Sequence, residues 1–312
     1  MKISVCLISF NGSSFLHEQI NSIIAQSVPV HEIIVSDDAS SDNTLSILNN
    51  YSLKFPELFK IINNKFNIGA VRNIEKAIQA SSGDLIFLAD QDDIWMPNKV
   101  ELTLAYLEQN PTIKCVFTNG LIINDQSEII EQTSLWDTMS FPMNLIQETG
   151  SDINLLKYIT EVENLATGAT MAFYKSLSFL QEPFPLIEGM FHDRWIALNL
   201  CLHNQLGFIN QPLIKYRLHA NQVIGGKKDN QQYFISNHIR LYNQEFNQIT
   251  FKEYKDLANK CAYNLSLNKQ LNFVQAVGNL IKTLEQLDII AKKQYPIRYW
   301  LRKCKKALSR FF

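Results

Sequence analysis

The first half of the chain alternates short apolar runs with segments of helical periodicity, and this alternation restricts the fold more than any other feature. The runs are residues 3–9, 33–35, 59–62 and 85–89. Runs of this kind are typical of parallel strands that are covered on both faces. The segments between them, 13–24, 41–48 and 70–80, place apolar residues at helical spacing. The pattern predicts an α/β fold with a doubly wound, mostly parallel sheet flanked by helices.

The charge of the chain is unevenly distributed. The formal net charge of the 312 residues is −1, yet residues 291–312 carry eight Lys or Arg and no Asp or Glu, so the first 290 residues carry −9. An acidic body argues against nucleic acid as its partner. The basic end also contains aromatics such as Trp300 and Phe311. This mixture predicts docking on an anionic membrane surface, with a solvated tail as the alternative.

The cysteines and the apolar runs indicate the cellular compartment of the protein. Five scattered cysteines show no metal-ligand spacing and indicate reduced thiols: Cys6, Cys115, Cys201, Cys261 and Cys304. The first strand begins at Ile3 without a signal peptide, and no apolar run approaches the roughly 20 residues that span a bilayer. We expect a cytoplasmic protein that is peripheral on the inner face of the cytoplasmic membrane.

Carboxylates follow two of the predicted parallel strands. Leu85–Ala89 runs directly into Asp90-Gln91-Asp92-Asp93, and the strand at 33–35 leads to Asp37-Asp38. In doubly wound sheets, ligands bind at the carboxyl ends of the strands. Oxygen ligands two residues apart suit a hard divalent ion such as Mg or Mn. A solvated turn that precedes the next helix is the alternative.

The sequence lacks the usual phosphate cradles at this edge. No Gly-x-Gly-x-x-Gly follows the first strand, and no Gly-x-x-x-x-Gly-Lys is found there. An acidic pocket needs a metal bridge to bind a phosphorylated ligand, because carboxylates and a diphosphate repel one another. Asp92 is therefore predicted to be a metal ligand.

Several stretches together resemble the family 2 glycosyltransferases of the GT-A fold. They are Val5–Asn11, Asp37–Asp42, Asn67–Asn73, Asp90–Trp95, His192–Trp195 and Tyr216–Gly225. The Asp-Gln-Asp-Asp-Ile-Trp form, with the later His-Asp and Tyr-Arg-x-His elements, is similar to the rhamnosyltransferase-like branch that builds bacterial surface polysaccharides. The resemblance implies a GT-A domain over residues 1–225, with a nucleotide-sugar half at 1–124 and an acceptor half at 125–225. A helical C-terminal region with the basic tail would occupy 226–312, and the poorly patterned span 125–150 is expected to be a loop-rich bridge.

The activity implied by the resemblance is metal-dependent, inverting sugar transfer. The donor would be dTDP-rhamnose or a UDP-sugar, and the acceptor a lipid-linked saccharide in O-antigen or capsule synthesis. One alternative is a sugar nucleotidyltransferase, but that class needs a Gly-rich, Arg-containing loop after the first strand, where this chain has Phe10-Asn11-Gly12-Ser13. The other is a catalytically silent adaptor that binds nucleotide sugars.

The resemblance also assigns donor-binding roles. Asp38 would accept the imide hydrogen of uracil or thymine, with capping of the following turn as the alternative. Phe10 would lie against the base, or else belong to the core. Arg72 would reach the base or a phosphate, or else pair with a neighbouring carboxylate. Asp90 would help to hold the ribose and the metal, and Gln91 would join the donor site.

The remaining roles concern the metal and the acceptor. Asp92, with Asp90, would bind Mg or Mn and so stabilise the leaving nucleoside diphosphate. His219 is a possible further ligand, because imidazole suits Mn better than Mg; a structural histidine is the alternative. Asp193 is the predicted general base, or else a helix cap. The residues expected at the acceptor are Thr167, Gly168, His192 and Trp195, although close packing would also explain the glycine.

Overall fold

The computed structural model describes residues 1–138, 155–187, 190–219, 246, 250–271, 274–296 and 298–299. The chain divides into two compact units, one of residues 1–139, 165–186 and 190–228, the other of residues 140–164, 187–189 and 229–312. The basic tail from residue 300 and most of residues 220–249, where the apolar spacing of Phe234, Ile235, Ile239 and Leu241 predicts the first helix of the C-terminal region, lie outside the described residues.

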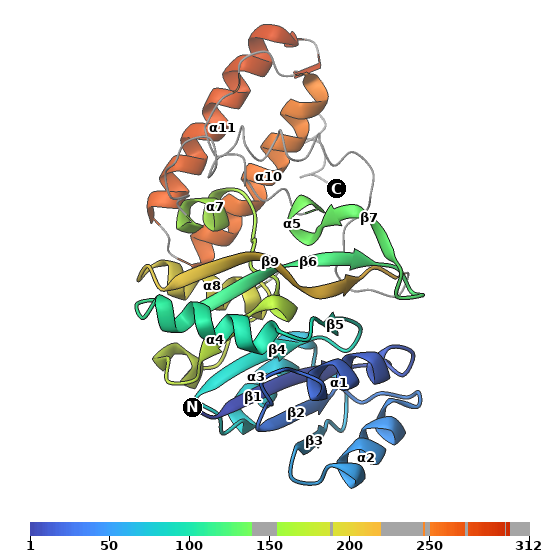
Figure 1. The fold of residues 1–312 in the computed structure, drawn as a ribbon. Helices are drawn as coiled ribbons and strands as arrows, with labels where there is room; N and C mark the ends of the chain where they lie inside the picture. The colour runs from blue at the N-terminus through green and yellow to red at the C-terminus, as the bar shows by residue number, and fades with distance from the viewer. Residues whose placement is uncertain are drawn as a thin grey trace. The chain divides into compact units, whose positions relative to one another are not determined.

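In the described part of the first unit, nine strands form one sheet in the order β3-β2-β1-β4-β8-β6-β9-β5, with β7 paired to β6 (Figure 1). Their bounds are β1 Ile3–Ser9, β2 Glu32–Asp37, β3 Phe59–Asn63, β4 Leu85–Ala89, β5 Ile94–Trp95, β6 Cys115–Ile123, β7 Ile129–Ser134, β8 Ala172–Tyr174 and β9 Leu206–Arg217. The pairs within β3-β2-β1-β4 and the pair β6-β9 are parallel, whereas β5, β7 and β8 run antiparallel to their neighbours. The predicted α/β class is confirmed. The prediction of a loop-rich bridge over residues 125–150 is wrong at residues 129–134, which form the strand β7.

The helices of this unit cover the sheet. They are α1 Leu16–Ile24, α2 Thr44–Lys54, α3 Ala70–Ala80, α4 Lys99–Gln109, α5 Leu135–Thr138 and α8 His192–Cys201. Leu16 and Ile20 of α1 belong to the same buried cluster as Val5 of β1 and Phe87 of β4, and none of the four is exposed. Burial of one such side chain stabilises the fold by about 1.5–3 kcal/mol. The expected helices at 13–24, 41–48 and 70–80 are therefore present, and their apolar spacing reflects this core.

The strand register decides which loops meet. Ser9 of β1 pairs with Asp37 of β2, and Leu7 pairs with Ala89 of β4, so the carboxyl ends of three strands lie at one edge of the sheet. The two-residue strand β5 pairs antiparallel with β9, where Ile94 lies opposite Lys215. This second pairing brings the end of β9 beside the acidic turn that precedes β5.

The second unit is helical in its described part: α7 Leu155–Glu161, α10 Phe251–Gln270 and α11 Val274–Gln294 pack on one another. Thr250 caps α10, because its hydroxyl accepts from the Glu253 N–H while its own N–H donates to the Glu253 carboxylate. The buried Asn264 amide donates to the Glu161 and Val162 carbonyls after α7. The helical character predicted for the C-terminal region is confirmed here. No helix among the described residues is long and apolar enough to cross a membrane.

Candidate active site

The loops after β1 and β2 are joined by side-chain hydrogen bonds. Oδ1 of Asp37 accepts from the hydroxyls of Ser9 (2.8 Å) and Ser40 (2.6 Å), and the Asn11 N–H donates to Ser40 Oγ at 2.9 Å. Asn11 and Ala39 have φ angles of 50° and 63°. The left-handed region costs an L residue such as alanine about 1–2 kcal/mol. The hydrogen bonds therefore hold these two loops in a strained and specific conformation.

Asp38 is buried and is held by the loop that leads into α3. Its Oδ1 accepts from Asn64 Nδ2 (3.1 Å) and the Ile68 N–H (2.8 Å), and its Oδ2 accepts from the Gly69 N–H (2.9 Å). Gly69 has φ 83°, which favours glycine. A carboxylate offers about four acceptor positions, so these three donors leave room for one from a ligand. Asp38 thus orders the loop and can still accept one further hydrogen bond.

Gln91 links the acidic turn to the loop after β1. Its amide makes two hydrogen bonds to the backbone of Phe10: Oε1 accepts from the N–H at 2.8 Å, and Nε2 donates to the carbonyl at 3.1 Å. A Cβ on Gly12 would lie 2.0 Å from Gln91 Oε1, so a side chain there would displace the Gln91 amide from its hydrogen bonds to Phe10. The Phe10 ring is 45% exposed and is not a core side chain. Arg72, in the first turn of α3, pairs with Glu75 at 2.7 Å, the alternative partner predicted for it.

Four carboxylates influence one another at this edge. Burial, reinforced by the charges of Asp92 and Asp193, raises the pKa of Asp90 to about 7. Burial and the charge of Asp92 also raise the pKa of Asp93 well above its usual range. Oδ2 of Asp93 is buried and has no hydrogen-bond partner in the described part of the chain. The structure therefore brings Asp90, Asp92 and Asp193 together, as the assigned roles require.

Lys99 is a buried cation behind the acidic turn that sequence reasoning missed. Its side chain is fully buried at the start of α4, its Nζ donates to the Ala169 carbonyl at 2.8 Å, and it lies 4.3 Å from the centroid of the Trp95 ring. Burial lowers the pKa of Lys99 to about 7, against the opposing charges of Asp93 and Asp90. A signal was available, because lysine at the first position of a helix opposes the helix dipole and needs another partner.

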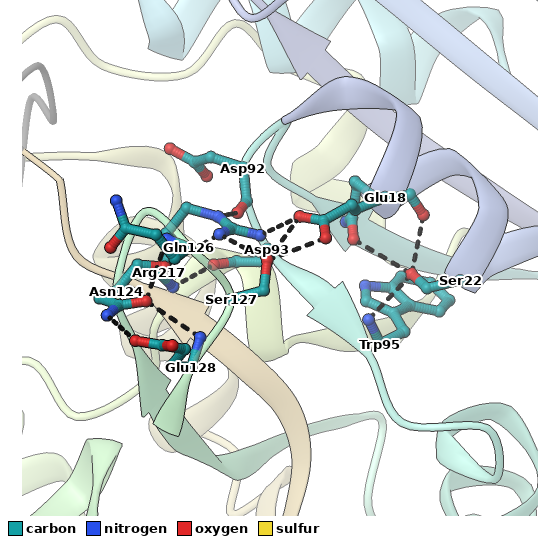
Figure 2. A network of polar contacts seen from close by, with 11 residues as sticks. Glu18, Ser22, Asp92, Asp93, Trp95, Asn124, Gln126, Ser127, Glu128 and Arg217 are labelled. Carbon is teal, nitrogen blue, oxygen red and sulfur yellow. Dashed lines mark hydrogen bonds and ion pairs between the residues drawn. The ribbon is translucent and has the colours of Figure 1, made fainter. Parts of the chain in front are cut away.

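Arg217, at the end of β9, is the second buried cation (Figure 2). Its Nε donates to the Asp92 carbonyl at 2.6 Å, its N–H donates to Asp93 Oδ1 at 3.0 Å, and its Nη2 pairs with Glu18 Oε2 at 2.6 Å. Two residues later, His219 Nε2 lies 2.9 Å from Asp92 Oδ2. The sequence pointed to His219 but gave Arg217 and Glu18 no role, because their ion pair spans 199 positions.

The residues around Asp92 fit a divalent cation. A carboxylate and an imidazole are side by side, and the cluster holds four carboxylates against the two cations Lys99 and Arg217. No three His, Cys, Asp or Glu side chains of the described residues are placed to hold an ion by themselves. Asp92 and His219 would therefore hold the cation, and ligand oxygens would complete its coordination. Carboxylate plus imidazole suits Mn²⁺ or Mg²⁺.

Asp193 lies in the first turn of α8 and faces the 3-10 turn Gly168–Thr170. Its Oδ2 accepts from the Gly168 N–H at 3.3 Å, and its Oδ1 accepts from the Arg194 N–H at 2.6 Å. Burial raises the pKa of Asp193, and the neighbouring His192 opposes this shift. A half-buried carboxylate with a raised pKa is a stronger base than a solvated one.

The residues expected at the acceptor are only partly accessible. His192 is buried, and its Nδ1 has no hydrogen-bond partner within the described residues. A Cβ on Gly168 would lie 2.7 Å from His192 Nε2, so glycine permits the close approach of the two segments. Thr167 and Trp195 are half-buried beside them. The structure brings Gly168 and His192 together around Asp193.

Known glycosyltransferase sequences are similar to this chain. The profile of "Glycosyl transferase family 2" matches residues 4–161. An uncharacterized glycosyltransferase of Haemophilus influenzae is 27% identical over 93% of this chain and 95% of the relative. The dTDP-rhamnosyl transferase RfbG of Shigella flexneri is 26% identical over 91% of this chain and 94% of the relative.

Solved structures show the same fold at lower sequence identity. The S. aureus protein TarS, residues 1–349, in complex with UDP-GlcNAc matches with a TM-score of 0.55 at 16% identity, over 93% of this chain and 83% of that 1–349 chain. The mannosyltransferase PcManGT of Pyrobaculum calidifontis, in complex with GDP-Man and Mn²⁺, matches with a TM-score of 0.51 at 14% identity, over 100% of this chain and 81% of that chain. The predicted GT-A architecture is thereby confirmed.

Proposed function

Because the chain belongs to glycosyl transferase family 2 and is an enzyme of the transferase class, we propose that it moves a sugar from a dTDP- or UDP-linked donor to a saccharide acceptor with the help of a divalent cation. The observation that carries this proposal is the gathering of Asp92, His219 and Asp193 at the carboxyl edge of the sheet. The name of the Shigella relative favours dTDP-rhamnose as the donor.

The donor would bind where the loops of β1, β2 and β4 meet. Asp38 has one acceptor position for the imide N–H of uracil or thymine, and the exposed ring of Phe10 offers a face for the base. Release of Arg72 from Glu75 would free a guanidinium for a phosphate. Asp90, which follows β4 directly, would bind the ribose.

The cation would be held by Asp92 and His219. When bound, it neutralises the negative charge that develops on the leaving diphosphate. Arg217, buried behind the acidic turn, holds the Asp92 carbonyl through Nε and the Asp93 carboxylate through its main-chain N–H. Lys99 donates to the Ala169 carbonyl and not to a carboxylate of the turn. The carboxylates of the turn would therefore favour a cation over a bare diphosphate.

Asp193 would act as the general base. As the acceptor oxygen bonds to the anomeric carbon, the bond from that carbon to the diphosphate oxygen breaks, and the acceptor proton passes to the Asp193 carboxylate. Such a displacement inverts the anomeric centre. Gly168 and His192, which pack against Asp193, would form the wall beside the acceptor hydroxyl.

The acceptor and the membrane belong to the same proposal. The name of an Escherichia coli relative, a glucosyltransferase that acts on a GlcNAc-diphosphoundecaprenol substrate, supports a lipid-linked acceptor, and surface polysaccharide synthesis is the process that we propose for it. The basic segment 291–312 would hold the enzyme at the anionic lipid that carries such an acceptor. Equal sedimentation of the full chain and a chain shortened at residue 299 with anionic vesicles would contradict the role of the tail.

A nucleotide screen tests the donor. We expect UDP and dTDP to bind about 10- to 100-fold more tightly than CDP in the presence of Mn²⁺, because a hydrogen bond to the charged Asp38 is made only with an imide N–H. Calorimetric titration measures the dissociation constants, and turnover with dTDP-rhamnose or UDP-hexoses then identifies the sugar. Equal affinities for UDP and CDP would contradict the role of Asp38, and the absence of binding by any nucleotide sugar would contradict the function.

The raised pKa of Asp193 predicts the pH dependence of transfer. Only the ionised carboxylate accepts a proton, so kcat is expected to fall as the pH drops through the raised pKa of Asp193, above the ordinary range of about 4 for aspartate. The measurement is kcat against pH at saturating donor and Mn²⁺, with circular dichroism to confirm that the fold persists. An acidic limb at the ordinary pKa of aspartate would contradict the assignment.

A further inference from the structure

Arg217 is fully buried, yet its guanidinium contacts segments from three parts of the chain (Figure 2). Nε donates to the Asp92 carbonyl at 2.6 Å, and Nη2 pairs with Glu18 of α1 at 2.6 Å. Nη1 donates to the Asn124 carbonyl (2.9 Å) and to Ser127 Oγ (3.0 Å) in the turn between β6 and β7. The cation also lies 4.5 Å from the ring centroid of Phe15.

The planar fork of arginine is needed for these contacts. Four of its five N–H groups point in three directions and find acceptors, whereas a lysine ammonium presents a single point charge with three donors. The main-chain N–H of Arg217 adds a bond to Asp93 Oδ1 at 3.0 Å. The guanidinium and the backbone of one residue therefore hold both the Asp92 carbonyl and the Asp93 carboxylate.

The same segment delivers His219. The Leu218 N–H donates to the Ile123 carbonyl at 2.9 Å, so the backbone remains fixed beyond the end of β9. The His219 ring lies 4.9 Å from the Phe15 ring, the same ring that the guanidinium contacts, and its Nε2 lies 2.9 Å from Asp92 Oδ2. Arg217 thus holds the carbonyl of Asp92, and the carboxylate of Asp92 contacts the imidazole of His219, two residues after Arg217.

We propose that Arg217 is a positioning residue that fixes Asp92 and His219 as a pair for the divalent cation, an inference that rests on the proposed function. Its far anchors are Glu18 and Ser127, and the Ser127 hydroxyl lies 2.8 Å from both Glu18 carboxylate oxygens. Neither anchor belongs to the donor or acceptor site. Outer-shell partners of metal ligands contribute about 10- to 100-fold to metal affinity.

The test is Arg217→Lys. We expect its Mn²⁺ dissociation constant in the presence of UDP to rise about 10- to 100-fold, measured by electron paramagnetic resonance, while UDP affinity without metal stays within about twofold of wild type. Arg298→Lys is the matched control, because it makes the same substitution at an exposed arginine outside the acidic cluster. We expect Arg298→Lys to change the Mn²⁺ dissociation constant by less than about twofold.

The outcomes separate this inference from the proposed function. If wild type binds Mn²⁺ and a folded Arg217→Lys binds it equally well, or if Arg298→Lys weakens binding as much as Arg217→Lys does, the positioning role is wrong and the metal-dependent function stands. If wild type binds no Mn²⁺ with UDP or dTDP, the metal-dependent function itself is wrong.

If Arg217→Lys does not fold, nuclear magnetic resonance of the wild-type protein tests the positioning role of Arg217. The Nε–H of Arg217 is expected to be protected from exchange and to be broadened by Mn²⁺ bound at Asp92. A sharp, unshifted Arg217 signal at saturating Mn²⁺ would overturn the positioning role.

Discussion

Asp193→Asn is expected to reduce kcat for sugar transfer by about 10²- to 10⁴-fold, the range that general base catalysis contributes. The amide has nearly the same shape and keeps one oxygen to accept from the Arg194 or Gly168 N–H, but it cannot take the acceptor proton. Donor affinity should stay within about twofold, because Asp193 contacts the Gly168 turn, where the proposed function places the acceptor and not the donor. Steady-state kinetics and calorimetry on the same sample measure both quantities.

The matched control is Asp137→Asn. Asp137 also lies in the first turn of a helix, α5, where it accepts from the N–H and hydroxyl of Ser134, and it is exposed. It should retain wild-type kcat, since it lies outside the acidic cluster. Turnover by Asp193→Asn at the wild-type rate would rule out Asp193 as the base and leave it as a helix cap.

Asp92→Asn is expected to lower kcat/KM by about a hundred- to a thousandfold, as is treatment of wild type with EDTA. Stabilisation of the leaving diphosphate by a cation is worth several kcal/mol, and each 1.36 kcal/mol is tenfold in rate. The variant keeps the backbone carbonyl that Arg217 binds and removes the charge that faces His219. Added Mn²⁺ should restore the EDTA-treated wild type and fail to restore the variant.

Asp84→Asn provides the comparison for Asp92→Asn. Asp84 precedes β4, whereas Asp92 follows it, and the exposed Asp84 carboxylate accepts from the Lys2 N–H at 2.7 Å. The activity of the Asp84→Asn variant should equal that of wild type. Hydrolysis of the donor at an undiminished rate in EDTA would contradict the metal requirement.

The sequence predicted the parallel half of the sheet because that half is built from local patterns. The apolar runs of β1 to β4 and the helices between them carry periodicities that can be read within a dozen residues. The antiparallel strands β5 and β7 escaped prediction for the opposite reason. β5 has only two residues, β7 has a mixed pattern, and the pairing of β5 with β9 joins positions about 120 residues apart. No local signal reports such a pairing.

The residues of the candidate site, like the strands, could be predicted only where a local pattern indicates them. Asp38, Asp90 and Asp92 could be found because they end parallel strands whose register brings them to one edge. The two buried cations were not found, since their partners lie far away in the sequence and only the position of Lys99 at a helix start gave a local signal. Lys99 is bonded to a carbonyl 70 positions away, and Arg217 to a carboxylate 199 positions away. The apolar pattern of a sequence identifies its core residues. It does not identify the partner of a buried charge, because that partner can come from a distant segment of the folded chain.

The ion pair between α1 and the end of β9 also has a consequence for the order of synthesis. A ribosome makes Glu18 and the acidic turn early and releases residue 217 only after more than two thirds of the chain has been made. Until then, the carboxylates of an N-terminal fragment repel one another without their guanidinium and imidazole. Chains that end before residue 217 therefore lack the contacts of Arg217 and His219 with Asp92, and such an incomplete enzyme would not consume activated sugar in the cell.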